Sequence, residues 1–177
     1  YEKMDSVISA INVGGMDAYT ILSEKQLNMR DFLTIASIIQ AESGYENFVT
    51  KVSAVVWNRL GEGWSDGTMG MDTTHESLMK WMQLNLPEYA DVSRSDISAQ
   101  NIIDAFNGAY AAGLVPAAGA AMYYAYNTRV DLAQAIGQPT RAGLPVGPVC
   151  SITSCSLTAA LAPDAEYLGE YYYFNNE

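Results

Sequence analysis

One helix, expected from residue 31 to about residue 43, constrains the fold more than any other feature of the chain. Its apolar side chains recur at positions i, i+3, i+4 and i+7, which places them on one buried face: Phe32, Ile35, Ala36 and Ile39. Asn28 followed by Asp31 is typical of a helix N-cap with an acidic first turn, and Gly44 supplies a stop. A helix with such a face must pack against other elements, so the chain is expected to form a hydrophobic core.

The rest of the sequence predicts more helices than strands. Further helices are expected over residues 48–60, 76–84, 95–112 and 156–161. Short strands are expected over residues 122–126 and 171–174, where β-prone tyrosines gather. The predicted fold class is therefore α+β, a helix-dominated single domain with a few short β-strands.

Length and charge limit the functions that are open to the chain. Its 177 residues favour one domain. A net charge of −11 makes nucleic acid a poor partner and disfavours an anionic membrane surface, whereas neutral ligands such as sugars stay open. No stretch has the length and apolar character of a membrane span. Because the chain begins with Tyr1 rather than Met, we expect that an upstream segment, with any signal or anchor, has been removed.

Glu42 breaks the apolar pattern of the first helix, because it follows Ile39 by three residues on the same face. Burial disfavours the charged form of a carboxyl and would raise its pKa. A carboxyl with a raised pKa is what general-acid catalysis at neutral pH requires. Two other interpretations stay open: the last turn could bring Glu42 to the surface, or Glu42 could pair with Arg59.

Other polar residues carry weaker signals. Asp72 lies in a glycine-rich loop, where most Asp residues form turns. His75 is the only histidine, which leaves little material for a Ser–His triad or a His-based metal site. Cys150 and Cys155 could form a disulfide or could flank a turn as two small apolar side chains, and a single Cys pair is a weak metal signal. The sequence predicts no metal and no cofactor.

Six short blocks occur in a fixed order along the chain. They are A-S-I-I-Q-A-E at 36–42, N-R-L at 58–60, D-T-T at 72–74, Y-N-T at 126–128, G-L-P-V-G-P-V at 143–149, and T-A-A-L-A-P at 158–163 followed by Y-Y-Y-F at 171–174. In this order they resemble the motifs of the YceG-like (MltG) family of endolytic murein transglycosylases.

The resemblance implies an enzyme that cleaves the MurNAc–GlcNAc bond within peptidoglycan glycan strands and leaves 1,6-anhydro-MurNAc ends. Glu42 matches the family's catalytic Glu and would be the single general acid and base. Arg59 would hold a stem-peptide carboxylate or order Glu42. The residues expected to contact substrate are Ser43, Arg59, Asp72, Thr74, Tyr126, Asn127, Thr128, Gly143, Leu144 and Pro145.

The resemblance also implies a domain organisation and a location. Residues 1–27 would be a lead-in, the remnant of an upstream region, and residues 28–177 the catalytic domain, with insertions near 95–120 and 129–142. The expected partners are glycan strands and the cell-wall synthesis machinery. The full-length protein would be membrane-anchored at the extracytoplasmic face of the bacterial cell membrane.

Two alternatives remain. Residues 35–60 also resemble SleB-like cell-wall hydrolases, in which the Glu would act with water, although residues 143–161 have no counterpart there. The chain could instead be an inactive peptidoglycan-binding or divisome scaffold domain, because Ser151, Ile152 and Thr153 replace the family's N-P-G and its usual tail is missing. An acid on the apolar face argues against a scaffold, since burying it costs free energy.

Overall fold

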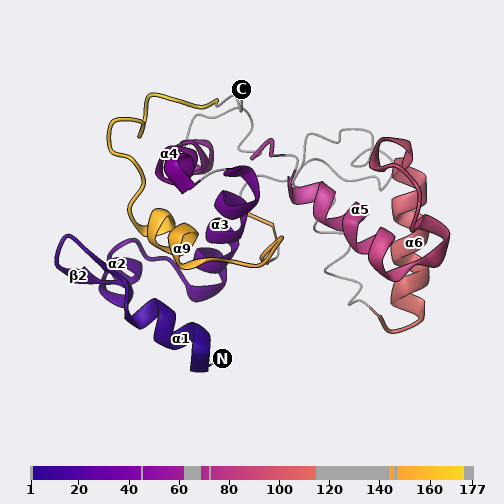
Figure 1. Cartoon of the computed structure of the whole chain (residues 1–177), viewed down its shortest axis with the longest axis horizontal. Helices are drawn as coiled ribbons and strands as arrows, with labels where there is room; N and C mark the ends of the chain where they lie inside the picture. Colours follow the sequence, from indigo (N-terminus) through magenta and orange to yellow (C-terminus); the bar gives the residue numbers. More distant parts are fainter. Residues whose placement is uncertain are drawn as a thin grey trace. The chain divides into compact units, whose positions relative to one another are not determined.

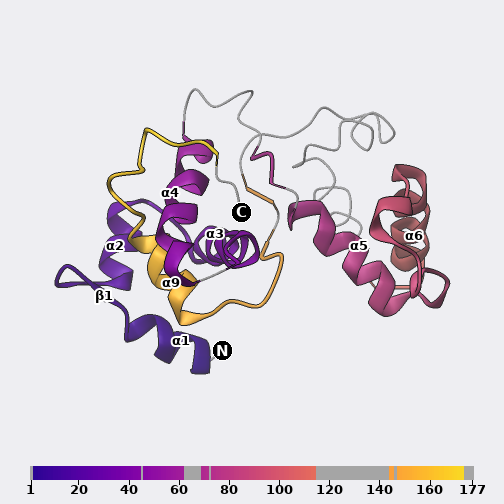
Figure 2. The same ribbon diagram turned by 45° about the horizontal axis from the view of Figure 1, so that its top comes forward.

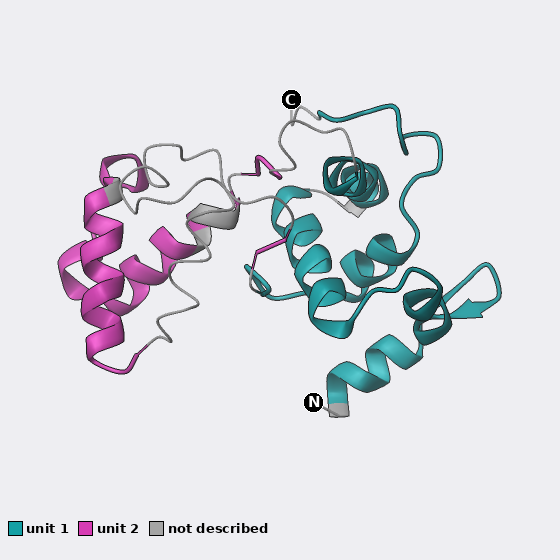
Figure 3. Ribbon diagram, turned by 180° about the vertical axis from the view of Figure 1, so that it is seen from behind, with its two compact units in different colours: residues 1–64, 147–177 teal, residues 65–146 magenta. Residues whose placement is uncertain are grey.

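The structure is a computed structural model that describes residues 2–44, 46–61, 69–71, 73–114, 144–145 and 147–173 (Figure 1). The chain divides into two compact units, residues 1–64 with 147–177 and residues 65–146 (Figure 3). Unit 1 therefore combines the two ends of the chain. Each unit is described by itself.

The centre of unit 1 is a three-helix core. Its helices are α3 (Met29–Glu42), α4 (Val49–Leu60) and α9 (Ser154–Leu161), and each packs against the other two (Figures 1 and 2). Two shorter helices, α1 (Glu2–Ser9) and α2 (Ala18–Glu24), also contact α9. A 3₁₀ turn, η1 (Glu46–Phe48), precedes α4.

Helix α3 confirms the helix predicted from the apolar stripe. The Asn28 side chain accepts a hydrogen bond from the Asp31 amide at 2.9 Å, as an N-cap does. All four stripe residues are buried, and Ile38 is buried as well. Helix α3 is therefore enclosed on more than one face, which explains its central position.

We expect Asn28→Ala to lower the free energy of unfolding by about 1 kcal/mol, because it removes the acceptor for the Asp31 amide. Asn28→Ser is the matched control and should hold the stability close to the wild-type value. Its hydroxyl keeps an acceptor for the Asp31 amide and places no second carboxylate beside the Asp31 side chain, to which Asn28 Nδ2 donates at 2.8 Å. Urea denaturation followed by circular dichroism measures both variants. Equal losses in the two would show that the cap does not stabilise α3.

Polar side chains of α4 complete the C-terminal end of α9. The last carbonyls of a helix lack partners within it. The Ser53 hydroxyl donates to the Ala159 carbonyl at 2.7 Å, and the Trp57 indole donates to the Ala160 carbonyl at 3.0 Å. These bonds fix α9 against α4 and so position residues 162–173, named here the closing segment, which leave α9.

Unit 1 also contains a small hairpin that no sequence pattern predicted. Its strands β1 (Asn12–Val13) and β2 (Met16–Asp17) pair antiparallel. Gly14 and Gly15 both have positive φ, 59° and 91°, which a two-residue hairpin turn favours. The hairpin joins α1 to α2. The first 27 residues thus contain two helices and a hairpin, and all belong to unit 1.

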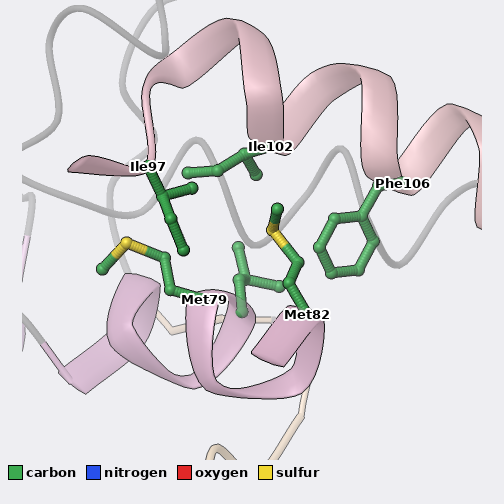
Figure 4. Close-up of a cluster of buried hydrophobic side chains, with 6 residues drawn as sticks. Met79, Met82, Ile97, Ile102 and Phe106 are labelled. Carbon is green, nitrogen blue, oxygen red and sulfur yellow. The ribbon is translucent and has the colours of Figure 1, made fainter. Parts of the chain in front are cut away.

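Unit 2 is built on two helices, α5 (Thr73–Asn85) and α6 (Ala99–Ala111), with 3₁₀ turns η2 (Pro87–Tyr89) and η3 (Arg94–Asp96) between them. Its core is one apolar cluster (Figure 4): Leu78, Met79, Met82, Ile97, Ile102 and Phe106. Helix α6 begins later than predicted, because Ser98 and Asn101 form a capping box and residues 94–96 form the 3₁₀ turn instead.

The predicted α+β class, dominated by helices, is confirmed. Among the residues that the structure describes, there are seven α-helices and one two-stranded sheet. The strand predicted over 171–174 is wrong for residues 171–173, which lie in neither a helix nor a strand. Side chains of α4 bind the carbonyls of Tyr171 and Tyr172. The strand predicted over 122–126 lies outside the described residues. Within the described ranges, no helix has the length and apolar character needed to cross a membrane.

Candidate active site

Glu42 is the last residue of α3 and is half-buried. The Ser43 amide donates to the Ile39 carbonyl at 2.9 Å and ends the helix there. Ile39 is fully buried one turn earlier, so the helix end brings Glu42 only partly out of the core. The sequence predicted that Glu42 lies on the apolar face and is buried. Glu42 is in fact only half-buried. The negative end of the helix dipole disfavours a charged carboxylate at this position.

Arg59, near the end of α4, is the charged neighbour of Glu42. Only 8% of its surface is exposed. Burial lowers the pKa of the Arg59 guanidinium below its ordinary value, and the negative charge of Glu42 acts in the opposite direction. Arginine stays protonated in proteins, so the carboxyl lies within electrostatic range of a buried cation. Of the alternatives for Glu42, an interaction with Arg59 is the one that the structure supports.

Arg59 also fixes the closing segment. Its Nε donates to the Tyr172 carbonyl at 2.7 Å, and its guanidinium lies 5.3 Å from the centre of the Tyr173 ring. A cation at this distance over an aromatic face is attracted to it. Arg59 thus connects the carboxyl at the end of α3 with the aromatic residues near the end of the chain.

Asn58, the residue before Arg59, organises the turn over residues 167–171. Its Nδ2 donates to the Tyr167 carbonyl at 2.9 Å and to the Tyr171 carbonyl at 2.6 Å, and its Oδ1 accepts from the Gly169 amide at 2.7 Å. Asn58 belongs to the N-R-L block, but no role was predicted for it from the sequence. Its position beside Arg59 was the available signal.

Two residues of the A-S-I-I-Q-A-E block hold the segment that precedes α9. The Ser37 hydroxyl accepts from the Val149 amide at 3.0 Å, and the Gln40 side chain accepts from the Thr153 hydroxyl at 2.5 Å. Sequence reasoning missed both roles, because their partners lie more than one hundred residues further along the chain. These bonds attach the loop at residues 149–153 to the same helix that carries Glu42.

The described residues of the predicted site are divided between the two units. Glu42, Ser43 and Arg59 lie in unit 1. Thr74 is the second residue of α5 in unit 2. Leu144 and Pro145 also belong to unit 2, and Leu144 is half-buried whereas Pro145 is buried. The other predicted contacts lie outside the described residues: Asp72, Tyr126, Asn127, Thr128 and Gly143. The substrate contacts of all these residues stay predictions.

The possible disulfide is absent, because Cys150 and Cys155 are free thiols. The Cys150 thiol donates instead to the Ser37 carbonyl of α3 at 3.2 Å, whereas Cys155 belongs to the first turn of α9. In the part of the chain that the structure describes, no three His, Cys, Asp or Glu side chains are grouped as a metal site would need.

Comparison with known proteins identifies the family to which the sequence is similar. The sequence profile described as the YceG-like family matches residues 1–177. No curated protein and no solved structure matches the chain. The match covers both compact units, including the first 27 residues.

Proposed function

The chain belongs to the YceG-like family, and we propose that it is a peptidoglycan lytic transglycosylase with Glu42 as its single general acid and base. Membership of this family is consistent with a cell-wall lytic enzyme of the murein transglycosylase type. The substrate of this chain would be the MurNAc–GlcNAc bond within glycan strands. The observation that carries the proposal is the position of Glu42. It is a half-buried carboxyl at the end of α3, and its charge acts on the buried Arg59 guanidinium.

The reaction needs one carboxyl group in two roles. Protonated Glu42 gives its proton to the glycosidic oxygen as the bond from that oxygen to the anomeric carbon of MurNAc breaks. The resulting carboxylate then takes the proton of the C6 hydroxyl of the same MurNAc. The C6 oxygen bonds to the anomeric carbon, which closes the 1,6-anhydro ring and returns the proton to Glu42. Because the C6 hydroxyl of the substrate attacks and no water is added, the second carboxylate that glycosidases use as a base or a nucleophile is not required.

Arg59 suits a role in ordering Glu42 better than a role in holding a stem peptide. It is almost fully buried, and its Nε is engaged by the Tyr172 carbonyl. A fixed cation beside Glu42 stabilises the carboxylate that forms once the proton has left, whereas the helix dipole disfavours that carboxylate. The two opposed effects suit a group that must both give and take a proton.

The products of the reaction test the proposal. We expect the chain to release muropeptides with 1,6-anhydro-MurNAc ends from uncrosslinked glycan strands, as read by mass spectrometry. Reducing-end MurNAc would instead identify a hydrolase that uses water, the SleB-like alternative. Binding of the strands without any product would identify a scaffold.

The substrate sets the place of action. Peptidoglycan lies outside the cytoplasmic membrane, so the enzyme would act at the extracytoplasmic face of the bacterial cell membrane, with the full-length protein anchored there. Cutting within strands would place it beside the cell-wall synthesis machinery. The net charge of −11 fits a partner other than nucleic acid.

A further inference from the structure

Unit 1 carries a group of aromatic residues that the mechanism does not use. It is named here the aromatic surface and consists of Phe48, Tyr167, Tyr171 and Tyr173. Tyr173 is 73% exposed, and Phe48 and Tyr171 are each 52% exposed. Exposed aromatic rings in a cluster are unusual unless they bind something, because they leave a large apolar area in water.

Three of the four rings are joined by direct contact or through a shared cation, and Tyr173 follows Tyr171 by two residues in the closing segment. The Tyr167 and Tyr171 rings lie 4.6 Å apart between centres. The Lys51 ammonium lies 4.9 Å from the centre of the Tyr167 ring and 5.9 Å from that of Phe48, and so connects the start of α4 with the closing segment.

Hydrogen bonds to α4 hold the backbone of the aromatic surface in place. The backbone at Tyr167 and Tyr171 is bound by Asn58, the backbone at Tyr172 is bound by Arg59, and the Asp164 amide donates to the Thr50 carbonyl at 3.0 Å. In Figures 1 and 2 the closing segment, drawn in yellow, runs past α4 in both views. A surface whose backbone is already fixed loses little conformational entropy when a ligand binds.

The aromatic surface reaches the candidate catalytic carboxyl through one residue. The Tyr173 ring lies over Arg59, and the charge of Glu42 acts on the same guanidinium. Arg59 is buried, so this connection runs through the body of unit 1. A ligand on the Tyr173 ring would therefore lie on the side of α4 that carries Arg59.

The charges around the rings favour a neutral ligand. The Tyr167 hydroxyl first, and then the negative charges of Asp164 and Glu166, raise the pKa of Lys51, so charges of both signs lie beside the rings. The chain as a whole carries −11, which disfavours phosphate polymers that could otherwise stack on aromatic rings. Pyranose rings meet these conditions, since their apolar C–H faces stack on aromatic faces and their hydroxyls bond to Tyr hydroxyls.

We propose that the aromatic surface is a glycan-binding subsite, on which Tyr171 and Tyr173 stack against sugar rings of the strand that Glu42 cleaves. This inference rests on the proposed function and adds to it the residues that grip the strand away from the cut bond. Such contacts are the same before and during the reaction, so they should affect KM rather than kcat.

Calorimetric titration with soluble uncrosslinked glycan strands tests the proposal, with all variants made in Glu42→Gln so that no strand is cut. Tyr171→Ala and Tyr173→Ala should each weaken binding about five- to tenfold, because each removes one stacking ring. Tyr173→Phe keeps the ring and should bind about as well as its parent. In the cleaving enzyme, Tyr171→Ala should raise KM and leave kcat close to its wild-type value.

Tyr110→Ala is the matched control, since Tyr110 lies on α6 in unit 2 and is 55% exposed. It should leave binding unchanged, and all variants should keep the parental unfolding temperature. Normal binding by both Ala variants, with anhydro products still formed by wild type, would overturn the subsite and leave the proposed function intact. No binding by the parent and no anhydro product from wild type would overturn both.

Discussion

Replacing Glu42 by Gln is expected to lower the rate of glycan cleavage by about 100- to 10,000-fold, the usual contribution of a general acid or base. Gln keeps the size of the side chain but has no proton to give to the glycosidic oxygen and cannot take one from the C6 hydroxyl. The loss should appear in kcat, while the strand still binds. Anhydro-ended products counted by mass spectrometry over time measure it.

Glu24→Gln is the matched control, because Glu24 is the last residue of α2 as Glu42 is the last of α3, and it is exposed. This variant should cleave at the wild-type rate. Glu42→Gln also removes the negative charge that faces buried Arg59, so its unfolding must be measured beside its activity. A folded Glu42→Gln protein that cleaves as fast as wild type would rule out Glu42 as the acid.

Helix α3 and the position of Glu42 on it could be predicted, because the residues that indicate them lie close together in the sequence. The apolar stripe and the Asn28 cap lie within one helix, and α3 begins at Met29 and ends at Glu42, close to the predicted 31–43. The position of Glu42 follows from the same helical period. Its final burial does not, because it depends on how the helix ends and on Arg59, which comes from another helix.

The closing segment shows where local patterns fail. Residues 171–173 are three tyrosines, and their β propensity predicts a strand. In the structure, the backbone carbonyls of the first two accept hydrogen bonds from Asn58 and Arg59, 113 residues earlier in the chain. Sheet formation needs those same carbonyls, so a tertiary contact that no short window contains decides the outcome. The hairpin at residues 12–17 was missed for the opposite reason, since two-residue strands are too short to show alternation.

Replacing Asn58 by Ala is expected to lower the free energy of unfolding by about 2–4 kcal/mol, because it removes three hydrogen bonds at a buried position at once. The loss exceeds that of an ordinary surface substitution because the carbonyls of Tyr167 and Tyr171 and the amide of Gly169 lose their side-chain partner. Urea denaturation measures the global effect. Amide hydrogen exchange measures the local one, since the Gly169 amide should exchange much faster in the variant.

Asn85→Ala is the control for the loss of an Asn side chain, because Asn85 is exposed and donates a single bond to the Trp81 carbonyl of its own helix. Its stability should stay within about 0.5 kcal/mol of wild type. If Asn58 fixes the closing segment, Asn58→Ala should also weaken glycan binding, although its side chain is buried beneath the aromatic surface and need not touch the strand. Loss of stability with unchanged Gly169 exchange would show that Asn58 stabilises α4 by packing alone, and that the aromatic surface is held by Arg59 without it.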